Sequence, residues 1–178
     1  MRLAFLCLIL ILGSDPLEAQ TPPPQPVAFR IGSVRFDRPE GWTYSRPTDG
    51  VRAAQLEKKS AGTPLVITFT RFPLGSGGTV QANVERWQAQ FLSLDSPPEV
   101  QTPAGTATPL TLVKLSGTMK GGVPGGPPKD TANTFLLGAI LEAPDGLVIV
   151  KLSGAKSSVA REEKAFSDLV RAAAGRSS

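Results

Sequence analysis

Two mainly apolar runs near the end of the chain, residues 134–143 and 147–153, are separated only by Pro144-Asp145-Gly146. Proline and glycine favour a tight turn here, because proline fixes φ and glycine tolerates positive φ. Two such runs joined by a short turn predict a β-hairpin of adjacent antiparallel strands. This hairpin is the strongest constraint in the sequence, since any fold must hold two long strands side by side in one sheet.

Five further segments have the alternation or the β-branched composition of strands, and turn residues bound each of them. They are residues 31–36, a short strand that begins at Trp42, and residues 51–56, 65–72 and 108–118. Residues 65–72 are apolar or β-branched almost throughout, which predicts a central strand covered on both faces.

The periodicity changes to that of a helix in two places. Residues 79–92 predict an amphipathic helix, because Thr79 can cap it and large apolar residues recur every three or four positions up to Phe91. A second helix is predicted from residue 157 or 158 to a stop at Gly175. Strands, helix, strands and helix in this order predict an α+β domain, a mostly antiparallel central sheet sandwiched between helices.

Residues 1–19 have the organisation of a cleaved signal peptide. Arg2 precedes an unbroken apolar run over residues 3–12, and Ala19 ends a cleavage triplet. The run is about half of the roughly 20 residues that a spanning helix needs. We therefore expect the mature chain to be exported, to the periplasm or beyond, without a transmembrane segment.

The remaining residues are expected to form one domain. Residues 20–27 are predicted to be a Pro-rich spacer, 28–175 the domain, and 176–178 a disordered tail. The single cysteine, Cys7, lies in the predicted signal peptide. The mature domain therefore has no disulfide, and its hydrophobic core must stabilise it alone.

The absence of histidine excludes many kinds of chemistry. Serine or cysteine nucleophiles activated by histidine and histidine-bound zinc are all ruled out. No cofactor or metal site is predicted. The acidic residues are the remaining general acids and bases, but no pair with a catalytic pattern is visible. We expect a non-catalytic binding or assembly module, with a carboxylate-dependent hydrolase or transferase and a structural envelope protein as alternatives.

The chain is basic, with 19 Lys and Arg against 15 Asp and Glu, and seven of the basic residues fall between positions 30 and 59. This bias fits an anionic protein or small-ligand partner. The alternative, which we favour, is that these side chains line solvated strand faces. Nucleic acid is not an expected partner, because an exported chain with no basic run lacks the usual features of nucleic-acid binding.

The segment Phe36-Asp-Arg-Pro-Glu-Gly-Trp42, the strand at 51–56, the helix that begins with Gly77-Gly78-Thr79, and a late hairpin before a C-terminal helix resemble the PsbP-like superfamily. That group includes PsbP of the oxygen-evolving complex, DcrB-type periplasmic proteins and a Ran-binding nuclear import factor. The resemblance extends over about residues 27–174. It implies a central antiparallel sheet between helices, a structural Trp42, and a role in binding or assembly rather than catalysis. It implies no particular partner, because the partners within the group differ.

Five residues are candidates for binding. Tyr44 and Arg46 alternate along one strand and should share a face, and an aromatic ring beside arginine is typical of an interaction hot spot. Lys120 and Lys129 bracket a Gly/Pro-rich loop that is either a spacer or a binding loop. Lys156 precedes the last helix, where it can contact an anion, although the surrounding residues lack a P-loop pattern and favour an ordinary helix cap.

Overall fold

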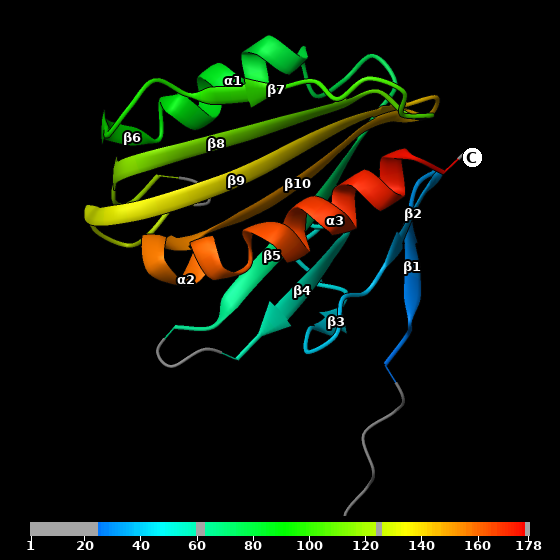
Figure 1. Ribbon diagram of the computed structural model, residues 1–178, viewed down its shortest axis with the longest axis horizontal. Helices are drawn as coiled ribbons and strands as arrows, with labels where there is room; N and C mark the ends of the chain where they lie inside the picture. Colours follow the sequence, from blue (N-terminus) through cyan, green and yellow to red (C-terminus); the bar gives the residue numbers. More distant parts are fainter. Residues whose placement is uncertain (1–24, 60–62, 124–125, 177–178) are drawn as a thin grey trace, which may run out of the picture.

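The computed structural model describes residues 25–59, 63–123 and 126–176, so the predicted signal peptide lies outside the described residues (Figure 1). In chain order the elements are β1 (Ala28–Ile31), β2 (Val34–Asp37), β3 (Thr43–Ser45), β4 (Ala54–Lys58), β5 (Leu65–Pro73), α1 (Val80–Gln88), β6 (Phe91–Leu94), β7 (Glu99–Gln101), β8 (Leu110–Met119), β9 (Thr131–Ala143), β10 (Gly146–Ala155), α2 (Lys156–Arg161) and α3 (Glu163–Ala174). None of the described helices is long and apolar enough to cross a membrane.

A single antiparallel sheet dominates the structure. Its strands lie in the order β3-β4-β5-β10-β9-β8-β6, with β7 also paired to β8, while β1 and β2 form a separate hairpin. The predicted hairpin around Asp145 is confirmed: β9 and β10 pair along their length, from Ala143 opposite Gly146 to Thr134 opposite Ala155. The mostly antiparallel sheet expected from the sequence is therefore present.

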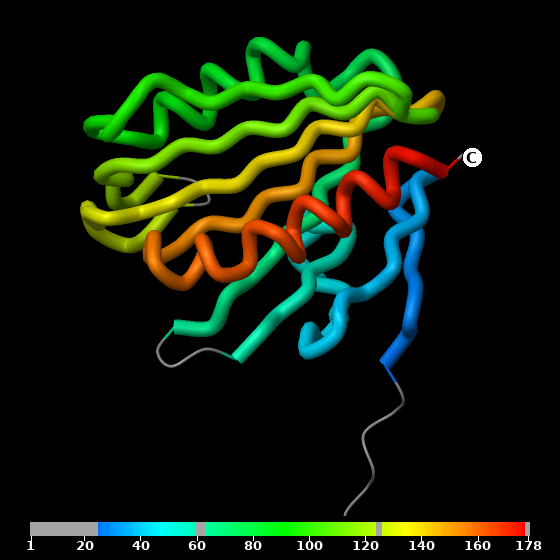
Figure 2. The backbone as a smooth tube through the Cα atoms, viewed as in Figure 1, coloured from blue at the N-terminus to red at the C-terminus, as the bar shows by residue number. Residues whose placement is uncertain are grey.

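The two faces of this sheet are covered unequally. On one face α2, α3 and the β1–β2 hairpin bury a continuous core that includes Trp42. Figure 2 shows the C-terminal helix α3 lying across the strands of the sheet. On the other face α1 packs mainly over β8 and β9 and leaves β5 and part of β10 partly exposed. The expected sandwich between helices is thus found only in part, and β5 is not covered on both faces as its composition predicted.

Residues 31–36 were expected to be one strand and are instead the tip of a hairpin. Gly32 has φ +59°, which turns the chain between β1 and β2, and Ile31 then lies opposite Val34. Both of these side chains are buried in the same core. The strand expected at 51–56 is likewise shifted, to Ala54–Lys58.

The first predicted helix is shorter than expected. Thr79 caps it as predicted, with its Oγ1 accepting a hydrogen bond from the Ala82 N–H at 3.1 Å. The helix ends at Gln88, and Phe91 already belongs to β6. The short strands β6 and β7 were not predicted.

The predicted C-terminal helix is found as two helices that meet at Glu162. The Glu162 carboxylate pairs with Lys58 at 2.7 Å, and the Glu163 carboxylate pairs with Lys114 at 2.5 Å. These two acids therefore join the helical segment to β4 and β8, in addition to favouring a helix N-terminus.

The β1–β2 hairpin is joined to the main sheet by Asp145, in the β9–β10 turn. The Ser33 hydroxyl and N–H donate to its carboxylate at 2.5 and 3.1 Å, and Arg71 donates to it at 2.9 Å. The hydrogen bond from the Ser33 hydroxyl is the largest cause that lowers the pKa of Asp145 below its usual 3.8, and Arg71 adds to it.

We expect Asp145 to contribute to the loss of stability in acid. Because its pKa is lower in the folded chain than in the unfolded chain, its contribution is fully present above the unfolded value of 3.8 and is lost as the pH falls through the folded value. The free energy of unfolding should therefore depend less on pH in this range for Asp145→Asn than for the wild type. Asp168→Asn, which removes an exposed carboxylate paired with Lys164, is the control. Identical acid dependence in the wild type and Asp145→Asn would contradict this role.

Candidate functional site

The part of the sheet that α1 leaves open forms a groove of about 610 Å³. Side chains on alternate positions of two strands make its floor, because alternate residues of a strand share a face. They are Val66, Thr68, Thr70 and Phe72 of β5 and Ile149, Lys151 and Ser153 of β10. Helix α1 forms one wall, and residues 49, 51 and 52 line the rim.

Asn83 holds the polar part of the α1 wall in place. It is fully buried, and its Nδ2 donates to the carbonyls of Gly77 and Thr79, both at 2.9 Å. Its Oδ1 accepts a hydrogen bond from Arg86 Nη1 at 2.7 Å. The Arg86 guanidinium is therefore positioned at the groove by a neutral amide, and it has no carboxylate partner among the described residues.

Trp87 forms the apolar part of this wall. It is 5% exposed and packs directly on the backbone of β9 at Gly138, where an added Cβ would lie 2.2 Å from Trp87 Cζ3. Phe72 lines the groove from β5 and is half-buried. Two aromatic rings therefore line the groove, Trp87 from α1 and Phe72 from β5.

Lys151 introduces a positive charge into a floor that otherwise combines apolar side chains with the hydroxyl groups of Thr68, Thr70 and Ser153. It lies in the middle of β10, opposite Thr68 on one side and Gly138 on the other. Burial lowers the pKa of its ammonium below the usual 10.5, since the charged form is less well solvated there. The main chain of Lys151 is also held, because its carbonyl accepts a hydrogen bond from the Thr68 hydroxyl at 3.3 Å.

An ion pair occupies the rim of the groove. Arg52 Nε lies 2.5 Å from Asp49 Oδ2, and Arg52 Nη1 donates to Gln55 at 2.7 Å. The backbone N–H of Arg52 and then its side chain lower the pKa of Asp49 to about 2. Asp49 is the one carboxylate among the described lining residues, and it is ionised and paired. The described residues also contain no cluster of three or more Asp, Glu, His or Cys that could hold a metal ion.

The residues proposed from the sequence do not line this groove. The Tyr44 ring packs on Phe29, with ring centroids 4.9 Å apart, and is half-buried at the edge of the core. Arg46 is exposed beyond the end of β3 and lines a separate shallow hollow together with Arg30 and Arg71. Tyr44 and Arg46 therefore differ in exposure.

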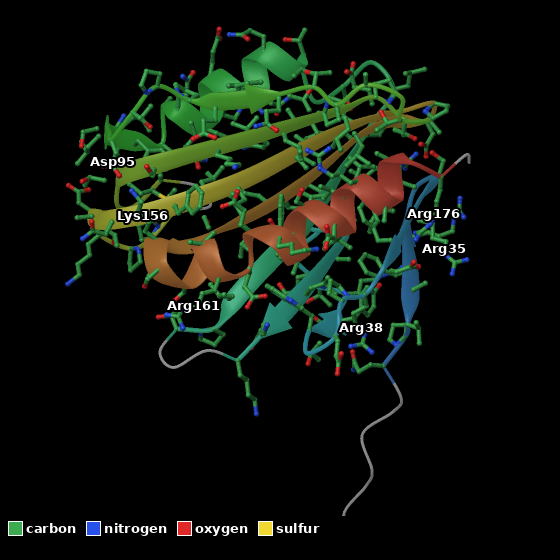
Figure 3. All side chains as sticks on the ribbon, viewed as in Figure 1. Arg35, Arg38, Asp95, Lys156, Arg161 and Arg176 are labelled. Atoms are coloured by element: carbon green, nitrogen blue, oxygen red, sulfur yellow. The ribbon has the colours of Figure 1, made fainter. Side chains whose placement is uncertain are left out.

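The three candidate lysines lie elsewhere on the surface. Lys120 Nζ donates to the Ala89 carbonyl at 2.8 Å, whereas Lys129 is exposed. Lys156 pairs with Asp95 at 2.9 Å, and Figure 3 shows these two side chains at the same end of the sheet. One sequence signal pointed to the groove: Lys151 interrupts a strongly apolar strand. The sequence shows that Lys151 is a charged residue in an apolar strand, but it does not show which other elements lie next to Lys151.

Comparisons with known proteins show the fold. No family model matches the sequence, and a search of curated proteins finds no match. The solution structure of cyanobacterial PsbP from Synechocystis is similar with a TM-score of 0.51 and 14% identity, covering 88% of this chain and 96% of that chain. A crystal structure of a Pseudomonas aeruginosa protein of unknown function gives a TM-score of 0.47 and 10% identity, covering 85% and 97%. The first similarity confirms the PsbP-like fold implied by the sequence.

Proposed function

We propose that the mature chain is an exported, non-catalytic binding module that holds a small amphipathic anion in the groove beside α1. Export is inferred from the signal-peptide organisation of residues 1–19. The observation that carries the binding role is the placement of Lys151 on a floor that also presents Val66, Phe72 and Ile149, next to an aromatic wall. A groove with a few fixed polar groups in mainly apolar surroundings is the usual form of a ligand site.

The charge of the groove supports an anionic ligand. Arg52, Arg86 and Lys151 line it, against the single carboxylate of Asp49. Val66, Phe72 and other apolar side chains would contact the uncharged part of the ligand. The three basic side chains would bind its acidic group. An alkyl or aromatic carboxylate has this combination of groups.

The same residues favour binding over catalysis. A carboxylate-dependent hydrolase needs two carboxylates set roughly 5–10 Å apart across the substrate. The described lining residues supply one, and Arg52 binds it. The resemblance to binding and assembly factors of the PsbP-like group points in the same direction.

Trp87 provides a direct readout of ligand binding. The chain has two tryptophans, and Trp42 is buried in the core of the opposite face. We expect laurate, an anionic amphiphile, to change the tryptophan emission in a saturable way, and Trp87→Phe to abolish this change. We expect Lys151→Met to weaken laurate binding at least tenfold, which corresponds to about 1.4 kcal/mol.

Lys164→Met is the matched control, because Lys164 lies on α3 and its side chain is 87% exposed. It should bind laurate like the wild type. Dodecanol, which has a similar chain and no charge, should bind much more weakly. Equal responses to laurate and dodecanol, or unchanged laurate affinity in Lys151→Met, would overturn the proposal.

A further inference from the structure

Two arginines occupy opposed positions on the outer surface of the β1–β2 hairpin. Arg30 and Arg35 are direct cross-strand partners, and both are exposed. Their neighbours Phe29, Ile31 and Val34 point to the opposite side, into the core. Like charges placed directly opposite in an antiparallel pair destabilise a sheet. The pairing therefore favours anions beside the two guanidinium groups, and the Asp37 carboxylate, 3.4 Å from Arg35, supplies one.

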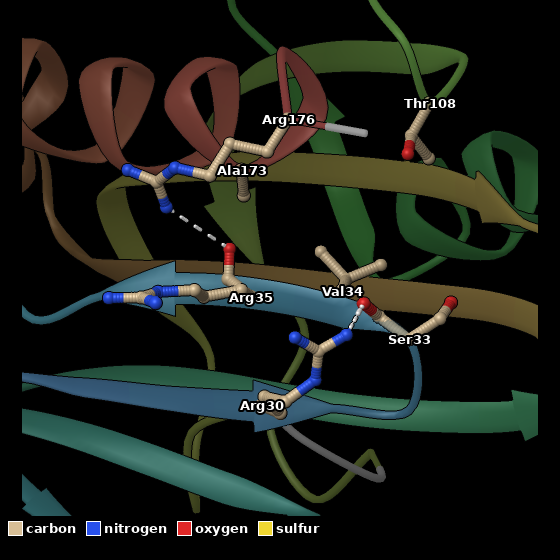
Figure 4. Close-up of a pocket in the computed structure, with 7 residues that line it drawn as sticks. All are labelled: Arg30, Ser33, Val34, Arg35, Thr108, Ala173 and Arg176. Carbon is tan, nitrogen blue, oxygen red and sulfur yellow. Dashed lines mark hydrogen bonds between the residues drawn. The ribbon is translucent and has the colours of Figure 1, made fainter. Parts of the chain in front are cut away.

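A third arginine reaches the same place from the end of α3. Arg176 pairs with Asp37 and donates from Nη1 to the Arg35 carbonyl at 3.4 Å. Arg30, Arg35 and Arg176 line one cavity of about 460 Å³, together with Ser33 and Thr108 (Figure 4). Residues from three distant parts of the sequence thus form this cavity on the face of the sheet opposite the groove.

The cavity has more positive than negative charge. Asp37 is shared by Arg176 and Arg35, which lies 3.4 Å from it. Arg30 has no carboxylate partner within the described ranges, and its guanidinium donates to the Ser33 carbonyl. Asp145 is close to Ser33, but it is bound by Ser33 and Arg71. Three guanidinium groups against the one carboxylate of Asp37 leave an excess of two positive charges.

The neighbouring main chain is compatible with an anion. The C-terminal end of a helix is partly negative, which would oppose one. Here the carbonyl of Ala174, the last residue of α3, is occupied by the Thr108 N–H at 2.9 Å. The Thr108 side chain is nearly buried and lines the cavity, where its hydroxyl can donate a hydrogen bond.

We propose that Arg30, Arg35 and Arg176 bind the phosphate group of a phosphate monoester. A planar guanidinium binds phosphate through two parallel hydrogen bonds, and a monoester carries nearly two negative charges at neutral pH. The charge of the monoester therefore matches the excess of two positive charges in the cavity. The volume of about 460 Å³ also leaves room for an organic group attached to the phosphate. The site does not depend on the groove proposed above, since the sheet separates the two.

The test is binding of glycerol phosphate to the mature protein, measured by isothermal titration calorimetry. We expect saturable binding that weakens at least tenfold in Arg30→Gln and in Arg176→Gln. Arg161→Gln is the control, because Arg161 is an exposed arginine on α2, away from Arg35 and Arg176 in Figure 3. In the absence of ligand, the melting temperature of Arg30→Gln should equal or exceed that of the wild type, since the substitution removes a repulsion.

A second arm distinguishes a soluble ligand from a lipid headgroup. Phosphatidylcholine vesicles that contain phosphatidic acid present the same monoester at a surface. Vesicle binding that is lost in Arg30→Gln, without binding of glycerol phosphate, would support the phosphate site and assign it to a lipid. Failure of both probes, or equal losses in Arg161→Gln and Arg30→Gln, would overturn the proposal. Laurate binding in the groove should be unchanged in Arg30→Gln, so the two proposals can fail separately.

Discussion

Replacement of Phe36 by alanine is expected to lower the free energy of unfolding by about 3–5 kcal/mol, the usual effect of removing a buried aromatic ring. Phe36 is fully buried and joins the β1–β2 hairpin to the main sheet. Its ring stacks on Phe29 at 5.6 Å and meets the edge of Phe69 in β5 at 5.0 Å. Urea unfolding of the purified protein would measure the change.

Phe72→Ala is the matched control for this substitution. Phe72 is half-buried and lines the groove on the other face, so the same chemical change should destabilise the protein less. Because Arg30 and Arg35 lie on the hairpin, Phe36→Ala should also weaken glycerol phosphate binding, whereas Phe72→Ala should not. Equal destabilisation by the two variants would mean that the hairpin is not held through Phe36.

Gly138→Ala is expected to lower the free energy of unfolding by about 1–3 kcal/mol and to disrupt the groove. The added Cβ would lie 2.2 Å from Trp87 Cζ3, which requires the indole ring or the strand to move. Overpacking of a buried contact has a cost of this size. The tryptophan emission should shift to longer wavelength as Trp87 becomes hydrated, and laurate binding should weaken with it.

Gly154→Ala tests whether the effect is specific to the contact with Trp87. An added Cβ at Gly154 in β10 would meet Leu65 and Val159 at 3.6 Å, which is an ordinary contact. This control should be neutral or stabilise the protein by up to about 1 kcal/mol. In a Trp87→Leu background, Gly138→Ala should have a smaller effect than in the wild type. An undiminished effect there would show that the strain lies elsewhere.

Local signals predicted the parts of the fold that depend on neighbouring residues. The Pro144-Asp145-Gly146 turn, the Thr79 cap and the strand at 65–72 are found close to their expected positions. Each of these features is determined by the backbone preferences of residues within a single turn or strand. The packing of distant segments has no comparable local signal.

The spacing of apolar residues gave the wrong element boundaries in two places. In each, the regular alternation of buried residues continues past the point where the strand or helix ends. Ile31 and Val34 both enter the core although Gly32 reverses the chain between them. Phe91 packs in the same cluster as Trp87, at a helical spacing, although its backbone is extended. Burial pattern alone therefore cannot distinguish these segments from a continuous strand or helix.

Neither proposed site could be assembled from the sequence. The groove combines β5, β10, α1 and the loop around Arg52, and its polar floor is evident only once the pairing of Lys151 with Thr68 is known. The excess of basic residues between positions 30 and 59 was visible. Its connection to Arg176 was not, because it depends on the contact between β2 and the end of α3.

β5 pairs with β10, a strand far from it in the sequence: Ile67 lies opposite Leu152, and Pro73 lies opposite Gly146. The N-terminal strands therefore lack a partner along one edge until nearly the whole chain has been synthesised, at about 5–20 residues per second. Pairing between such distant segments is also slow, because closing the long loop loses chain entropy before any contact is gained. The full sheet is therefore expected to close late in folding, only after β10 has been synthesised and has reached β5.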